Sequence, residues 1–167
     1  MPLGAAALLL GLALLGLRTP WGEDLLAQRE YAGAARVIDG DSIEIDGTRI
    51  RISGIDAPEM AQSCISREGA SYPCGRRARA ELERLSGGGT VTCRREGRDR
   101  FQRVLATCRA GDADLATAMV GAGWAVAYAG SSGDRLRGAE RRARDARAGL
   151  WAGSFERPED WRHRAGR

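Results

Sequence analysis

Acidic residues gather in two short segments of this sequence, DGDS at 39–42 and DAPE at 56–59. Each segment follows the end of a predicted strand, and we expect a hairpin to bring the two strand ends together. Asp41, Asp56 and Glu59 would then crowd one edge of a sheet, which is unfavourable unless a cation lies among them. Oxygen ligands without histidine or thiolate favour a hard ion, calcium or magnesium. The pattern therefore predicts a metal site.

Acidic residues also form turns, which is the alternative interpretation of Asp39, Asp41 and Asp46. For Asp46 we adopt the turn, because Asp46-Gly47 is a strong signal for a two-residue hairpin. For Asp41 taken together with Asp56 we favour metal binding.

Two arginines belong to the same strand pattern. Arg51 lies on the polar face of the strand that leads into Asp56, and Arg103 opens a later strand in DRFQR. A single arginine on a strand face is usually solvated. Two that converge beside a carboxylate cluster can clamp a phosphate, because each guanidinium donates two parallel hydrogen bonds.

Histidine chemistry is excluded by composition. The chain has one histidine, His163, close to its end. Ser-His-Asp, Cys-His and histidine-rich zinc sites all need histidine within the domain. We expect His163 to be a tail residue without a role, so catalysis would depend on carboxylates and arginines.

The bulk properties describe one globular domain of 167 residues with short extensions, 43 % hydrophobic and 29 % charged. The net charge is +4, and all 26 basic residues are arginine. A compositional bias of the genome explains this as readily as an anionic partner does, although a basic balance favours such a partner.

Alternating apolar and polar residues predict the elements that position these side chains. Strands are expected at 35–39, 42–46, 48–53, 90–95 and 103–109. Helices are expected at 75–86, from Asp112 or Asp114 through Met119, and at 134–149. Five short strands with a helix between the third and fourth predict an α+β, mainly β fold, a five-stranded OB-fold barrel with three helices.

The ends of the chain differ from this domain. Residues 3–17 form an unbroken apolar run within a leader at 1–18, and its length falls between a signal peptide and a membrane anchor. We expect a linker at 19–33, the domain at 34–152 and a charged tail at 153–167. The leader predicts an extracytoplasmic protein, either secreted or periplasmic, or anchored by its N-terminus.

Four cysteines are consistent with export, because disulfides need an oxidising compartment. Three pairings can be drawn. Cys93 and Cys108 occupy the two arms of a predicted hairpin and can face each other, which leaves Cys64 to pair with Cys74 across a short loop. A four-cysteine zinc site is the alternative, but no CxxC pair is present.

The motif pair DGDS and RIRISGIDAPE, followed by DRFQR, resembles the staphylococcal nuclease (thermonuclease) family over about residues 35–151. The loop between Cys64 and Cys74, with YPCGR, resembles exported bacterial members. The resemblance implies an OB barrel with three helices. It also implies calcium-dependent endonucleolytic cleavage of DNA and RNA that leaves 3′-phosphates, by a monomer that prefers single-stranded or frayed ends.

The resemblance also implies roles for individual residues. Asp41, Asp56 and the backbone carbonyl of Ala57 would bind Ca²⁺. Glu59 would be the general base. The two phosphate-binding arginines would be those at positions 51 and 103.

Three positions depart from the family pattern. Ser42 replaces a threonine and keeps its hydroxyl. Phe101-Gln102 replaces a tyrosine-glycine pair, which affects the placement of Arg103. The stretch 129–135 lacks a tyrosine-rich segment, so Tyr128 is the remaining candidate for stacking on a base.

Two non-catalytic alternatives make different predictions. Scaffold domains of this family usually lack some of the acidic and arginine positions, and all of them are present here. An OB domain that binds single strands without cutting needs exposed aromatics, and this chain is 5 % aromatic.

Overall fold

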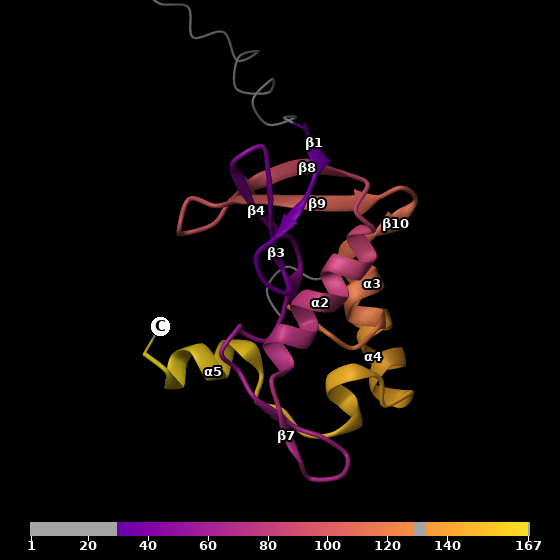
Figure 1. Cartoon of the computed structure of the whole chain (residues 1–167). Helices are drawn as coiled ribbons and strands as arrows, with labels where there is room; N and C mark the ends of the chain where they lie inside the picture. Colours follow the sequence, from indigo (N-terminus) through magenta and orange to yellow (C-terminus); the bar gives the residue numbers. More distant parts are fainter. Residues whose placement is uncertain (1–29, 129–132, 167) are drawn as a thin grey trace, which may run out of the picture.

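The computed structural model describes residues 30–128 and 133–166. The expected leader and most of the expected linker lie outside these residues. Figure 1 shows a curled half-barrel sheet with helices α2, α3 and α4 gathered on one side of it. This arrangement confirms the predicted α+β, mainly β fold class.

The main sheet contains all five expected strands and two more, β1 and β10. Its order is β1-β8-β9-β4-β3-β2, and β10 pairs with β9. The strands of this sheet are β1 (Glu30–Ala34), β2 (Arg36–Val37), β3 (Ser42–Ile45), β4 (Thr48–Ile52), β8 (Thr90–Arg98), β9 (Val104–Ala110) and β10 (Ala113–Asp114). Two small sheets pair β5 (Ile55–Asp56) with β11 (Val126–Ala127), and β6 (Cys64–Ile65) with β7 (Ser71–Tyr72).

Strands β3 and β4 form the hairpin that the alternating pattern predicts. Ile43 faces Ile50 across this hairpin, and both are fully buried. Asp46 and Gly47 make the turn with positive φ angles, 48° and 75°, which confirms the turn interpretation of Asp46. Strand β4 also pairs in parallel with β9, with Arg51 opposite Leu105, so Arg103, which immediately precedes β9, leads into the strand next to that of Arg51.

Four α-helices and a 3-10 helix are present in the described part of the chain. They are α2 (Cys74–Ser86), α3 (Leu115–Gly121), α4 (Asp134–Asp145), η1 (Gly149–Ala152) and α5 (Pro158–Arg164). Asp114, one of the two expected caps, accepts a hydrogen bond from the backbone N–H of Thr117 at the start of α3. The expectation of three helices missed α5.

Both disulfides form as expected. Cys93 lies directly opposite Cys108 in the β8–β9 hairpin, and Cys64 joins Cys74. No described cysteine is free, which excludes the four-cysteine zinc alternative. Leu150 packs with the Cys64–Cys74 pair in a small second core.

The two ends of the described chain are ordered, contrary to expectation. Strand β1 pairs with β8 within the stretch assigned to a linker, because its backbone completes the open edge of β8. Residues 158–164, assigned to a charged tail, form α5, which starts with the buried Pro158 at its first turn. Within residues 30–128 and 133–166, no helix has the length and hydrophobicity needed to span a bilayer.

Candidate active site

A tight turn after β2 positions Asp41. The backbone N–H of Asp41 donates to the carboxylate of Asp39, and its carbonyl accepts from Ile52 N–H at 2.8 Å. Gly40 brings this turn against Ala57 and α2, because a Cβ at Gly40 would lie 2.6 Å from that of Ala57. Asp39 therefore acts as a turn former, while Asp41 is turned inward and buried.

Asp56 ends β5, where it pairs with Val126 of β11, and it is also buried. The guanidinium of Arg51 spans the two carboxylates. Its Nη1 donates to Asp41 Oδ1 at 2.8 Å, and its Nη2 donates to Asp56 Oδ1 at 2.9 Å. The hairpin thus brings Asp41 and Asp56 together as the sequence predicts.

The charge at this point is only partly compensated. Burial raises the pKa of Asp41 to about 7, although Arg51 lowers it, and the neighbouring charges of Asp39 and Asp56 raise it further. For Arg51, burial acts to lower the pKa, but Asp41 and Asp56 raise it more, so its pKa lies above the ordinary value. A buried carboxylate in this state is stabilised by an additional cation.

Glu59 does not join the other two carboxylates directly. No three Asp, Glu, His or Cys side chains in the described ranges form a group that could hold a metal ion, so the expected cluster of three carboxylates is not formed. Glu59 lies farther out, with its side chain 32 % exposed, and is connected to Asp56 through Arg162. The Nη1 of Arg162 donates to Asp56 Oδ1 at 2.8 Å and to Glu59 Oε1 at 3.0 Å.

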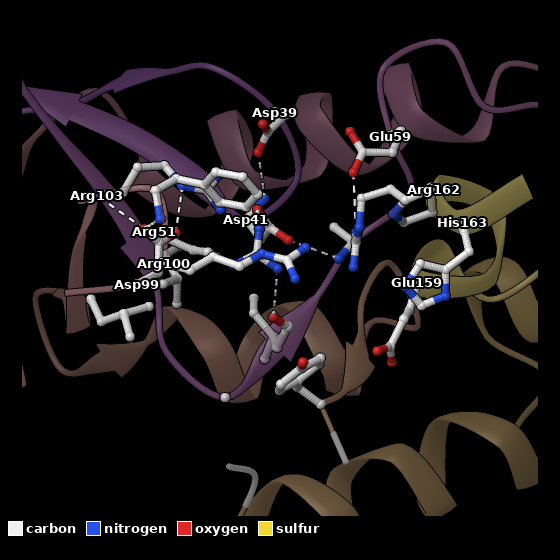
Figure 2. A pocket seen from close by; sticks show the side chains of 18 residues that line it. Asp39, Asp41, Arg51, Glu59, Asp99, Arg100, Arg103, Glu159, Arg162 and His163 are labelled. Atoms are coloured by element: carbon white, nitrogen blue, oxygen red, sulfur yellow. Dashed lines mark hydrogen bonds and ion pairs between the residues drawn. The ribbon is translucent and has the colours of Figure 1, made fainter. Parts of the chain in front are cut away.

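Arg162 is the residue that sequence reasoning missed. It comes from α5, within the stretch expected to be a tail (Figure 2). The available signal was local: Pro158 with Glu159 and Asp160 behind it is a helix start, followed by basic residues in the last turn. His163, expected to have no role, lines the same cavity as Arg162.

Arg103 lies on the other side of Asp41 from Arg162 in Figure 2. It pairs with Asp99, Nε to Oδ2, at 2.7 Å, and its guanidinium lies 5.5 Å from the centre of the Phe101 ring. Gln102 adopts the left-handed conformation that glycine favours, with φ of 63°. The Phe-Gln pair is therefore accommodated, and Arg103 faces the cavity with 30 % of its side chain exposed.

A cavity of about 670 Å³ joins these groups. Its wall includes the sequence-predicted residues Asp41, Arg51, Ala57, Glu59, Arg103 and Tyr128. Phe101 and Tyr128 are the exposed aromatics of this wall, 64 % and 37 % exposed. The cavity wall thus combines guanidiniums, carboxylates and aromatic rings, which suits an anionic ligand with planar groups.

The donor set fits a hard divalent cation. Asp41 and Asp56 contribute oxygens close enough for one guanidinium to span, and Ala57 is brought beside them because its N–H donates to Asp41 Oδ2 at 3.0 Å. A metal here would be held by two carboxylates and the Ala57 carbonyl.

Comparison with known proteins decides the family. The model of the family described as staphylococcal nuclease homologue matches residues 49–153. The chain belongs to the staphylococcal nuclease family. This confirms the resemblance carried by the motif pair and agrees with the OB-like sheet.

Three relatives extend the comparison. An uncharacterized endonuclease of Escherichia coli is 35 % identical over 141 residues, covering 80 % of this chain and 86 % of that protein. The succinoglycan biosynthesis protein ExoI of Rhizobium meliloti is 36 % identical over 130 residues, covering 77 % and 68 %. A micrococcal nuclease of Shigella flexneri is 30 % identical over 144 residues, covering 76 % and 77 %.

Membership of the staphylococcal nuclease family makes this protein a nuclease that hydrolyses phosphodiester bonds, with nucleic acid as its substrate. Enzymes of this family are generally metal-dependent, which agrees with the fit of the Asp41 and Asp56 oxygens.

Proposed function

We propose that this nuclease cleaves DNA and RNA endonucleolytically with Ca²⁺ as its cofactor and leaves 3′-phosphate ends. The observation that carries the proposal is the bridge of Arg51, which lines the cavity, across the two buried carboxylates of Asp41 and Asp56. This arrangement supports a site in which the carboxylates hold a metal ion and the Arg51 guanidinium holds a phosphate next to it. Oxygen ligands alone favour Ca²⁺ over softer metals.

Asp41, Asp56 and the Ala57 carbonyl would hold the ion. When bound, Ca²⁺ supplies positive charge that polarises the scissile phosphate. The ion would take the place that the Arg51 guanidinium occupies between Asp41 and Asp56. No further carboxylate is needed for this, because both already present oxygens to a cationic group. Arg51 is then available to the phosphate.

Glu59 would take the proton of the attacking water. It stands at the edge of the cavity with its carboxylate partly exposed, where water can reach it. A general base needs to lie within hydrogen-bond reach of the proton that it removes.

Arg51 and Arg103 would bind the phosphate and stabilise the charge that develops on it. Arg51 reaches the cavity from β4, and Arg103 reaches it from the position just before β9, the parallel neighbour of β4. Stabilising developing charge is usually the largest catalytic contribution, and losing one such group costs about 10²–10³ in rate. Tyr128 would stack on a base at the opening of the cavity, which favours single-stranded or frayed ends.

The experiment incubates the purified protein with DNA and with RNA, in Ca²⁺, in Mg²⁺ plus EGTA, or in EDTA, and types the product ends. We expect cleavage in Ca²⁺ only, and products that carry 3′-phosphate. Full activity in Mg²⁺ with excess EGTA would show that Ca²⁺ is not the required ion. Products with 3′-hydroxyl ends would contradict the proposed chemistry, and binding without cleavage would favour a scaffold.

We also propose that the protein works outside the cytoplasm as a monomer. Two disulfides support the location, because such bonds persist in oxidising compartments. Fractionation of cells that express the full chain tests the location: periplasmic or medium recovery indicates a cleaved leader, membrane recovery an anchor, and cytoplasmic recovery contradicts the proposal. Sedimentation measures the oligomeric state.

A further inference from the structure

We propose that Arg162 of α5 is a positioning residue that holds Glu59 in place beside Asp56. The inference rests on the proposed role of Glu59 as the general base. It concerns a part of the chain beyond the staphylococcal nuclease homologue match, which ends at residue 153.

Three hydrogen bonds define this contact. Arg162 Nη1 donates to both Asp56 Oδ1 and Glu59 Oε1, at 2.8 and 3.0 Å, and its Nη2 donates to Asp56 Oδ2 at 3.0 Å. The guanidinium is thus bidentate on one carboxylate and shares a nitrogen with the other. Its planar fork fixes the relative orientation of both acids, which an ammonium group cannot do.

Glu59 needs such a partner because its side chain lies in the cavity wall and is partly exposed, so that burial alone does not fix its position. Only Arg162 makes a hydrogen bond or ion pair with the Glu59 carboxylate in the described part of the chain. A solvated glutamate samples several rotamers, whereas a reacting group must be held close to its productive geometry. The Arg162 guanidinium restricts that sampling.

Helix α5 is docked firmly enough to support this role. The amide of Gln62, which is fully buried, accepts from Glu59 N–H at 3.2 Å and donates to the Glu156 carbonyl at 2.8 Å. One side chain therefore ties the loop that carries Glu59 to the segment that leads into α5.

A backbone contact fixes the same segment farther upstream. Ile65 and Ser154 exchange two backbone hydrogen bonds, at 2.9 and 3.0 Å. Gly153 permits the approach, because a Cβ there would lie 1.9 Å from the Ile65 carbonyl oxygen. Residues 153–162 thus run from a fixed backbone pair to the site, and Arg162 is delivered to a defined position.

The positive charge of Arg162 suggests a different role, competition with the metal ion for Asp56, and the experiment distinguishes this role from positioning. A guanidinium on Asp56 could instead compete with the metal ion, and its removal would then raise activity at limiting Ca²⁺. Positioning requires the opposite result, a loss of rate that depends on Glu59.

The first experiment measures kcat at saturating substrate, at both limiting and saturating Ca²⁺, for wild type, Arg162→Ala, Glu59→Gln and the double variant. We expect Arg162→Ala to lower kcat by about 10- to 100-fold in the wild-type background, as partners of active-site ligands do. In the Glu59→Gln background the further loss should be no more than about twofold, because the positioned group is already gone. Equal losses in both backgrounds, or a rise in kcat, overturn the proposal.

Arg164→Ala is the matched control. Arg164 is an exposed residue of the same helix and pairs with Glu156 at 2.7 Å, away from the two acids. We expect it to leave kcat unchanged, and an equal loss in this variant would assign the effect to helix docking and overturn the positioning role. Millimolar guanidinium, at constant ionic strength, should partly restore Arg162→Ala but not Glu59→Gln, whereas no restoration counts against the proposal.

The second experiment does not need activity. The same four proteins are unfolded with urea in EDTA, and the free energies are combined in a double-mutant cycle. A favourable coupling between Arg162 and Glu59 supports the contact, and zero coupling overturns it. If wild type cleaves nothing, the proposed nuclease chemistry has failed, and this cycle still decides whether Arg162 holds Glu59.

Discussion

Gly40 lies so close to Ala57 that a Cβ on Gly40 would approach the Ala57 Cβ to 2.6 Å. Such a Cβ would also lie 2.8 Å from that of Ala78 on α2. Gly40 precedes Asp41 in the chain and Ala57 follows Asp56. The contact between Gly40 and Ala57 therefore sets how closely the two carboxylates approach.

The first prediction concerns Gly40→Ala. Crowding against Ala57 and Ala78 should lower the free energy of unfolding by about 1–3 kcal/mol, and separating Asp41 from Asp56 should weaken Ca²⁺ binding and slow cleavage. Urea unfolding and calorimetric Ca²⁺ titration measure both effects. Gly89→Ala is the control, because a Cβ at Gly89 meets no atom within 4 Å. Wild-type stability and Ca²⁺ binding of Gly40→Ala would show that the contact of Gly40 with Ala57 does not set the separation of Asp41 from Asp56.

Arg103 provides the second prediction. Arg103→Ala should lower the cleavage rate by about 10²–10³ while circular dichroism stays unchanged, because the phosphate loses one guanidinium. Arg109→Ala, on strand β9 but exposed and outside the cavity, should keep full activity. A loss of less than tenfold in Arg103→Ala would remove this residue from the catalytic set.

Local pattern was sufficient to predict strands β2, β3, β4, β8 and β9 and the meeting of Asp41 with Asp56. Their hairpin depends on alternation and on the Asp46-Gly47 turn, both of which are visible within a few residues. Arg162 contacts Asp56 across 106 positions, and no short-range periodicity encodes a contact of that separation. Strand β1 was missed for a similar reason, since its pairing with β8 is decided by a distant edge rather than by its own residues.

Gln102 is the subject of the third prediction. Its φ of 63° is costly for a residue with a Cβ, by about 1–2 kcal/mol, and glycine avoids that cost. Glycine gains freedom in the unfolded chain, which offsets about 0.5–1 kcal/mol. Gln102→Gly should therefore stabilise the protein by up to about 1 kcal/mol. Gln102→Ala keeps the Cβ and should show no gain in the same urea titration; equal stabilisation by both would refute the backbone explanation.

The disulfides give the fourth prediction. Replacing either pair by alanines should cost about 3 kcal/mol, because the bonds close loops of 15 and 10 residues in the unfolded chain. The two disulfide variants should differ in cleavage rate. The Cys64–Cys74 pair adjoins the Ile65–Ser154 contact and Gln62, so its loss should slow cleavage more than the loss of Cys93–Cys108. Rates are compared at a temperature where both variants are folded, and equal rates would contradict this assignment.

The fifth prediction concerns Asp114 and pH. Burial acts to raise the pKa of Asp114, but hydrogen bonds from Arg135 and Thr117 lower it more, so its pKa in the folded protein lies below 3.8. Its contribution is therefore complete above that ordinary value and is lost as the pH falls through the lowered pKa. Asp114→Ala should cost about 1–2 kcal/mol at neutral pH, from the lost helix cap, and the difference from wild type should shrink in acid.

Asp112→Ala is the control for that experiment. Asp112 is exposed and does not cap α3, so its replacement should change the unfolding free energy by no more than about 0.5 kcal/mol at any pH. If the deficit of Asp114→Ala stayed constant down to acid pH, the ionised carboxylate would not be the stabilising form.

The docking of α5 has a consequence for the order in which the protein is made. Glu59 and its partner Arg162 are 103 positions apart, so Arg162 is synthesised long after Glu59. A nascent chain therefore carries the acidic residues and Arg51 well before it carries the group that aligns Glu59. We therefore expect a chain truncated within α5, before Arg162, to keep the acidic residues and Arg51 but to lack the guanidinium that contacts Glu59.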